Sequence, residues 1–113
     1  MSRGLGDVYK RQAYCRETTA YPACFYKEND GYSVIFPDLN YLATQGDSFG
    51  EAMRMAAECL AGYLRAAQRD GDAIPAPSDL ADIDPVAVSK ELAPALPVGE
   101  ASVHLVSVDI RRG

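Results

Sequence analysis

The sequence is poor in the residues on which most catalytic and metal centres depend. It contains no tryptophan, one histidine (His104) and three widely spaced cysteines, Cys15, Cys24 and Cys59, without a Cys-x-x-Cys pair. Structural zinc centres take four Cys or His ligands, usually at short spacings, so this set predicts no metal site. We expect reduced thiols instead, two of them in the core.

Long apolar runs are also missing from the sequence. No segment is apolar over the length needed to cross a bilayer, and no basic start precedes an apolar stretch as in a secretory signal. With 113 residues, 48% hydrophobic and 24% charged, the composition is typical of one globular domain. We therefore expect a cytoplasmic protein without membrane contact. Because so short a domain buries a modest core, we also expect a homodimer or higher homo-oligomer.

Basic residues are outnumbered in the sequence. Eleven Lys and Arg stand against sixteen Asp and Glu, a formal net charge of −5. Non-specific nucleic-acid binding needs clustered Lys and Arg to displace counterions, so this balance disfavours it. It favours a basic partner, because complementary charge speeds encounter.

The first twelve residues look foreign to the rest of the chain. The run DVYKRQ (residues 7–12) equals a translation of GAT GTG TAT AAG AGA CAG, which resembles a transposon end used to prepare sequencing libraries. We interpret residues 1–12 as adaptor-derived and non-native, with a genuine disordered N-terminus as the alternative. Without this segment the formal net charge becomes −7, because it holds three basic residues and one acidic residue.

Three short segments rich in aromatic and β-branched residues predict an antiparallel meander. These segments are residues 19–27, 32–36 and 41–45. Residues 28–31 (ENDG) join the first two, and they predict a tight hairpin turn because Asn and Asp tolerate left-handed backbone and Gly adopts it freely. Pro22 lacks a backbone donor, so it belongs near the strand start or on an edge.

A capping pattern predicts the start of a long helix over residues 49–69. Ser48 precedes Glu51 by three positions, as in a capping box. Charged residues then recur at spacings of three, four or seven positions along one face, while alanine and other apolar residues line the opposite face. Gly71 predicts the end of the helix through a left-handed cap.

Five prolines between residues 74 and 97 forbid a long regular element there. We expect an extended wrap with one short helical turn near residues 86–92. Residues 101–110 (ASVHLVSVDI) then predict a strand, placed parallel to an earlier strand by a right-handed crossover. The fold class is therefore α+β, a β-β-β-α-β order in which one long helix packs on the sheet. The proline-rich segment or a second subunit should cover the other face.

Three ordered segments together resemble the HicB antitoxin family. They are YPACFYKENDGYSVIFPDL (residues 21–39), ATQGDSFGEAMRMAAECLAGYL (43–64) and IPAPS (74–78), and the last strand is similar as well. Many relatives carry Pro-Gly after the FPDL segment, where this chain has Asn40 and Tyr41. The departure concerns the geometry of that bend.

The resemblance implies a partial ribonuclease-H-like fold and an antitoxin role in a type II toxin–antitoxin system. The implied partner is HicA, a small basic RNA-cleaving toxin whose active site the antitoxin covers. Relatives usually continue past the last strand into a segment that binds operator DNA, and this chain stops at Gly113. Operator binding is therefore expected only where such a segment exists, and we treat residues 13–113 as the antitoxin domain.

Enzymatic alternatives find little support in the sequence. Metal-dependent nuclease chemistry needs several carboxylates around two ions, and Ala23, Cys24 and Phe25 leave the first strand without one. The sequence has no nucleophile elbow and no glycine-rich phosphate loop. We expect no catalytic residue, cofactor or metal. The competing class is an orphan structural or oligomerisation module without a toxin partner.

Five residues around the hairpin and the following bend are candidates for contact with the toxin. They are Tyr32, Asp38, Asn40, Tyr41 and Asp47. Exposed Tyr and Asp suit the surface of a basic, RNA-binding partner. For Asp38 and Asp47 a role in defining the turns remains the alternative.

Overall fold

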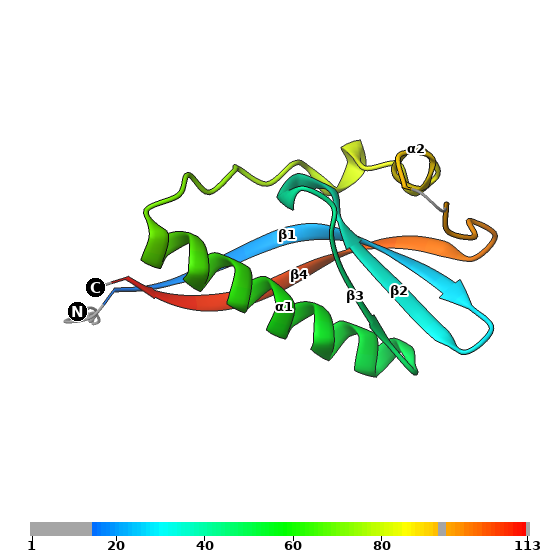
Figure 1. Ribbon diagram of the computed structural model, residues 1–113, viewed down its shortest axis with the longest axis horizontal. Coiled ribbons are helices and arrows are strands. Elements are labelled where there is room, and N and C mark those ends of the chain that lie inside the picture. The colour runs from blue at the N-terminus through cyan, green and yellow to red at the C-terminus, as the bar shows by residue number, and fades with distance from the viewer. Residues whose placement is uncertain (1–14, 93–94, 113) are drawn as a thin grey trace, which may run out of the picture.

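The computed structural model describes residues 15–92 and 95–112, so the segment 1–12 lies outside the described residues. Its elements confirm the α+β class and the predicted order, and the short helical turn expected near residues 86–92 is present as a helix over Pro85–Lys90 (Figure 1). In chain order they are β1 (Cys15–Glu28), β2 (Gly31–Phe36), the 3-10 turn η1 (Pro37–Leu39), β3 (Leu42–Gly46), α1 (Phe49–Asp70), the 3-10 turn η2 (Leu80–Asp82), α2 (Pro85–Lys90) and β4 (Ala101–Arg112).

The four strands form one antiparallel sheet in the order β3-β2-β1-β4. β1 pairs with β4 over residues 15–26 but with β2 over residues 24–28 alone. Pro22 therefore lies where β1 has a strand neighbour on one side only. This position fits the expectation that Pro22 belongs on an edge, because its missing N–H leaves no gap in the β1–β2 ladder.

The direction of β4 corrects the sequence-based expectation of a parallel strand. β4 runs antiparallel to β1, with Ala101 opposite Tyr26 and Arg112 opposite Cys15. The connection makes two passes along the sheet, since α1 runs away from the β1–β2 hairpin and the extended segment after it runs back (Figure 1). The chain thus re-enters the sheet at the hairpin end, from which β4 has to run against β1.

The predicted hairpin is present, but its turn uses the backbone differently. Among the described residues other than glycine, positive φ occurs at Asn40 and Tyr41, so Asn29 and Asp30 do not take the left-handed conformation. Gly31 has a φ of 151°. A Cβ on Gly31 would lie 2.3 Å from the carbonyl oxygen of Gly46, so the hairpin and the end of β3 approach too closely for a side chain.

Helix α1 begins and ends as its sequence predicts. The Ser48 hydroxyl accepts a hydrogen bond from the N–H of Glu51 at 3.1 Å, and the Glu51 carboxylate accepts one from the N–H of Asp47 at 2.7 Å. At the other end Gly71 takes the left-handed conformation and its N–H bonds back to the last turn. The buried face carries the predicted small and aliphatic residues Ala52, Ala56, Leu60, Leu64 and Ala67.

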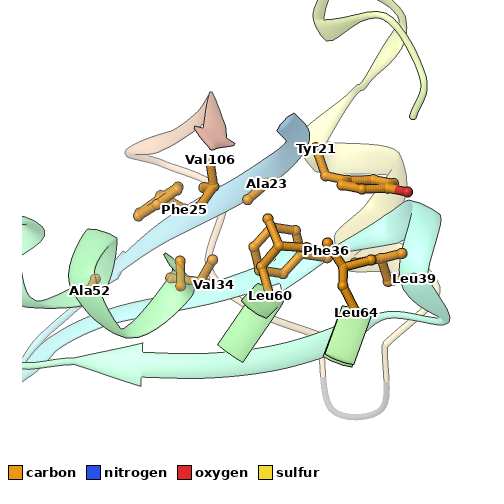
Figure 2. Close-up of a cluster of buried hydrophobic side chains, with 11 residues drawn as sticks. Tyr21, Ala23, Phe25, Val34, Phe36, Leu39, Ala52, Leu60, Leu64 and Val106 are labelled. Atoms are coloured by element: carbon orange, nitrogen blue, oxygen red, sulfur yellow. The ribbon is translucent and has the colours of Figure 1, made fainter. Parts of the chain in front are cut away.

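The main core lies between α1 and one face of the sheet. Alternate residues of β1 and β2 point toward the helix, as the period of two in a strand requires. Figure 2 shows Leu60 and Leu64 of α1 gathered with Phe36 and Leu39. The sheet residues of this core are Tyr21, Ala23, Phe25, Val34, Phe36 and Val106.

The proline-rich segment covers part of the opposite face, as expected. A second core of Cys24, Tyr26, Ile35 and Val88 forms there, packed against Ile83, Leu92 and Leu96. Three side chains tie the segment down. The Tyr21 hydroxyl donates to the carbonyl of Pro75, the Tyr26 hydroxyl donates to that of Pro85, and Asp38 accepts two hydrogen bonds from Ser78. No helix within the described ranges is long and apolar enough to span a bilayer.

Candidate partner-binding surface

A groove of about 270 Å³ lies at the hairpin end of the sheet. It forms because Tyr32 pairs with Gly46, which brings the β1–β2 turn beside the exit of β3. We call it the hairpin groove. Its lining residues are Glu28, Asp30, Gly31, Tyr32, Ser33, Gln45, Gly46 and Asp47.

The hairpin groove is acidic. Glu28, Asp30 and Asp47 bring carboxylates to its lining, which contains no Lys or Arg. Glu28 accepts a hydrogen bond from the hydroxyl of Ser33. In residues 15–92 and 95–112, no three His, Cys, Asp or Glu side chains come close enough to hold a metal ion together. The separated carboxylates of this groove suit the Lys and Arg side chains of a protein partner instead.

A second, larger hollow of about 400 Å³ adjoins this groove on the sheet face opposite α1. Ser33 and Gln45 line both hollows, so the two are neighbours. The floor of the second hollow is mostly apolar, and we call it the sheet hollow. Its lining residues are Ser33, Ile35, Ala43, Thr44, Gln45, Leu92 and Leu96. Apolar surface bordered by polar and charged surface is the composition typical of a protein–protein interface.

An aromatic group supports the hairpin groove from the α1 side. The Tyr32 ring packs edge-on against Phe49, with ring centroids 5.5 Å apart, and the Lys27 ammonium lies 5.4 Å from the Tyr32 ring centroid. Phe49 in turn contacts Phe25 and His104. These contacts fix Tyr32 at the edge of the groove, while Phe49 remains 36% exposed.

The structure divides the five predicted contact residues between two places. Tyr32 and Asp47 line the hairpin groove. Asp38, Asn40 and Tyr41 lie beyond Phe36, at the other end of β2, which spans six residues or about 20 Å. Both carboxylate oxygens of Asp38 already accept hydrogen bonds from Ser78, each at 2.7 Å.

The bend that carries Asn40 and Tyr41 is strained. Their φ angles are 59° and 60°, a left-handed conformation that Asn tolerates and that is rare for a bulky aromatic residue. Tyr41 is 38% exposed, so burial offsets little of this strain. Strain of this kind occurs often at functional positions.

Sequence reasoning missed most residues of this surface. The sequence predicted only a turn for Glu28 and Asp30. It predicted a strand position for Gln45 and the start of a helix for Phe49. No local signal marks them, because the groove exists only once β3 has paired with β2.

Cys24 and Cys59 are not activated nucleophiles. Burial raises the pKa of the Cys24 thiol, a hydrogen bond with Tyr26 partly opposes this effect, and the nearby Asp84 carboxylate adds to it. Burial also raises the pKa of the Cys59 thiol. Reactive thiols need a lowered pKa, so both residues stay protonated at neutral pH.

Comparison with known proteins supplies the biological setting. A family model described as HicB_like antitoxin of bacterial toxin-antitoxin system matches residues 20–98. A curated relative, an uncharacterized 14.9 kDa protein in the rep-hol intergenic region of Haemophilus phage HP1, is 36% identical over 55 residues. That match spans 49% of this chain and 41% of the relative's length, well under two thirds of it.

Three solved structures share the fold. The first is a toxin–antitoxin complex from Streptococcus pneumoniae, with a TM-score of 0.69, 27% identity and coverage of 80% of this chain and 69% of that one. The second is a HicA3 and HicB3 toxin–antitoxin complex, with a TM-score of 0.58, 22% identity and coverage of 77% and 94%. The third is the N-terminal domain of the Burkholderia pseudomallei antitoxin HicB, with a TM-score of 0.56, 22% identity and coverage of 81% and 100%.

Proposed function

Because the chain belongs to the HicB-like antitoxin family of bacterial toxin–antitoxin systems, we propose that it binds a HicA-type RNA-cleaving toxin and neutralises it by covering the toxin's active site. The observation that carries this proposal is the apolar sheet hollow with the acidic hairpin groove at its rim. An RNA-cleaving protein has to present positive charge to its substrate, and this surface offers negative charge beside an apolar hollow.

Inhibition then follows from occupation of the surface. Lys and Arg side chains of the toxin that enter the hairpin groove pair with Glu28, Asp30 and Asp47 and are withdrawn from RNA phosphates. Apolar toxin side chains that fill the sheet hollow lose contact with water, which stabilises the complex. The antitoxin breaks no bond in this process and acts stoichiometrically, without enzymatic activity. Since an RNA-cleaving toxin acts on cellular RNA, we place the complex in the cytoplasm.

The five residues predicted from the sequence take different parts in this proposal. Tyr32 and Asp47 contact the toxin directly from the hairpin groove. Asn40 and Tyr41 extend the contact surface at the far end of β2 and β3. Asp38 contributes mainly by holding Ser78, and with it the proline-rich segment, in place.

The proposal is tested by purifying the full chain with a HicA-type toxin encoded beside its gene and by measuring RNA cleavage. We expect a stable complex in which RNA is protected at equimolar antitoxin. A folded chain that neither binds the toxin nor protects RNA would refute the proposal and favour an orphan module of the same fold.

Double variants that each remove two negative charges test whether the hairpin groove is the surface that binds the toxin. Asp30→Asn together with Asp47→Asn should weaken toxin binding at least tenfold, about 1.4 kcal/mol, and reduce its dependence on salt. The matched control is Asp72→Asn with Asp82→Asn, which removes the same charge from exposed positions outside the groove. Equal weakening by both pairs would show that net charge, and not the hairpin groove, drives binding.

A further inference from the structure

Strand β4 forms one edge of the sheet, and its outer side has no strand partner in the described part of the chain. The strand is twelve residues long. Its pairing with β1 is unbroken from Tyr26 opposite Ala101 to Cys15 opposite Arg112, so no bulge twists the edge away. The figure shows it extended along the full length of the sheet (Figure 1).

The first eight of the twelve residues of β4 lack the usual protection against pairing, because its charged residues, Asp109, Arg111 and Arg112, all lie in its last four positions. Monomeric sheet proteins protect their edges with charged side chains, prolines, bulges or very short strands. Residues 101–108 (ASVHLVSV) contain no Asp, Glu, Lys, Arg or Pro. The opposite edge, β3, is only five residues long, so the two edges differ in this respect.

Apolar side chains continue this edge on the sheet face opposite α1. Leu105 lies near the centre of β4 and is 51% exposed. No other large hydrophobic residue in the described part of the chain is as exposed. Elements η2 and α2 both lie against β4 and carry Leu80 and Val86, each 40% exposed. We call Leu80, Val86 and Leu105 the β4 patch.

We propose that the edge of β4 and the β4 patch form the self-association interface of this protein, where a second copy pairs its own β4 in the antiparallel direction. Two four-stranded sheets then become one sheet of eight strands around a two-fold axis. Antiparallel pairing of identical strands closes on itself, so it yields a dimer and not a fibre. The β4 patches of the two copies meet beside the paired strands and add apolar burial to the hydrogen bonds.

The distribution of charge favours a second copy over other occupants. Each chain carries a formal net charge of −5, so two copies repel each other over most of their surface. Residues 101–108 have no charge and allow two acidic copies to approach. A basic partner would find no carboxylate in this stretch, whereas it finds three in the hairpin groove.

The two interfaces use different parts of the sheet. β4 and β3 lie at opposite edges, with β1 and β2 between them. The sheet hollow, lined by Ala43, Thr44 and Gln45 of β3, therefore remains open in the dimer. Self-association does not depend on the proposed antitoxin function. Under the proposed antitoxin function, each dimer binds two toxin molecules, one on each copy.

The test compares the mass in solution of the full chain and of two lysine variants. We expect the wild type to sediment as a dimer at micromolar concentration. Leu105→Lys should halve the observed mass and raise the dissociation constant at least about 100-fold, because a lysine is among the commonest protections of an edge strand. Ala43→Lys is the matched control on the other edge, where the residue is also exposed, and should remain dimeric.

Hydrogen exchange shows whether the variant is folded and where the interface lies. In the wild type the outward amides of β4 should be protected, and this protection should be lost in Leu105→Lys while β1 amides stay protected. A monomeric wild type, a dimeric Leu105→Lys variant or equal dissociation of Ala43→Lys would each overturn the proposal. Toxin binding by monomeric Leu105→Lys would show separately that the proposed antitoxin function does not need the dimer.

Discussion

Asp38 holds Ser78 with both oxygens of its carboxylate: one accepts the backbone N–H and the other accepts the hydroxyl, each at 2.7 Å. The two residues are 40 positions apart. Asp38 follows β2, and Ser78 lies in the extended segment that returns along the sheet. This pair therefore fixes the path of the chain between α1 and α2.

Removal of this clamp should destabilise the fold. Asp38→Ala loses both hydrogen bonds, and we expect a loss of about 1–2 kcal/mol in the free energy of unfolding, since both partners remain partly accessible to water. Ser78→Ala keeps the bond from the backbone N–H and should lose about half as much. Urea denaturation of the three proteins checks this order, and a wild-type midpoint for Asp38→Ala would contradict it.

Substitution by alanine at Gly46 and at Gly62 should change the stability of the protein in opposite directions. A Cβ on Gly46 would lie 2.4 Å from the backbone nitrogen of Ala52, so Gly46→Ala must separate β3 from the first turn of α1 and should cost about 1–3 kcal/mol. A Cβ on Gly62 meets no atom within 4 Å in the middle of α1. Gly62→Ala should stabilise the protein by about 0.5–1 kcal/mol through helix propensity. Thermal melting of both variants tests the pair, and a stabilised Gly46→Ala would refute the close approach.

Stability should fall at alkaline pH because of Tyr26. Burial raises its pKa well above the ordinary value of 10.0, with neighbouring Cys24, Asp84 and Tyr41 adding to the effect. Above pH 10 the folded state keeps a proton that the unfolded state releases. The stabilisation that Tyr26 provides by staying neutral is therefore fully present below pH 10 and is lost as the pH rises above it. Burial raises the pKa of Cys24 above 9.0, and the decline should begin near that pH.

The variant Tyr26→Phe separates this effect from packing. It loses the hydrogen bond that the hydroxyl donates to the carbonyl of Pro85 at 2.7 Å, so it should be about 1 kcal/mol less stable at neutral pH. Its free energy of unfolding should then fall less steeply than that of the wild type above pH 10. Urea titrations at a series of pH values provide the comparison, and parallel curves would show that Tyr26 is not the group responsible.

Tyr41 should show a conflict between stability and binding. Its left-handed backbone is strained, and glycine adopts this conformation freely. We expect Tyr41→Gly to raise the free energy of unfolding by up to about 1 kcal/mol and yet weaken toxin binding, because the exposed ring is lost. Asn40→Gly is the control for the stability measurement, since Asn tolerates the conformation and little strain is relieved. Unchanged affinity in Tyr41→Gly would remove this residue from the proposed contact surface.

Local chemistry made several elements predictable from the sequence. The start of α1 depends on Ser48 and Glu51, three positions apart, and its end on the left-handed Gly71. The hairpin and the extended proline-rich segment follow in the same way from residues close together in the chain. The family resemblance, which rests on ordered segments of the sequence, is confirmed by the family match over residues 20–98.

The sequence by itself thus determined the elements, their order and the family, because each depends on neighbouring residues or on the pattern of the whole chain. Only the tertiary structure decided the direction of β4, the clamp between Asp38 and Ser78, and the hairpin groove. Each of these depends on how distant segments pair. Strand direction depends on where the returning chain meets the sheet, and the groove exists because Tyr32 pairs with Gly46. No local propensity encodes such a meeting of segments, so packing settles it.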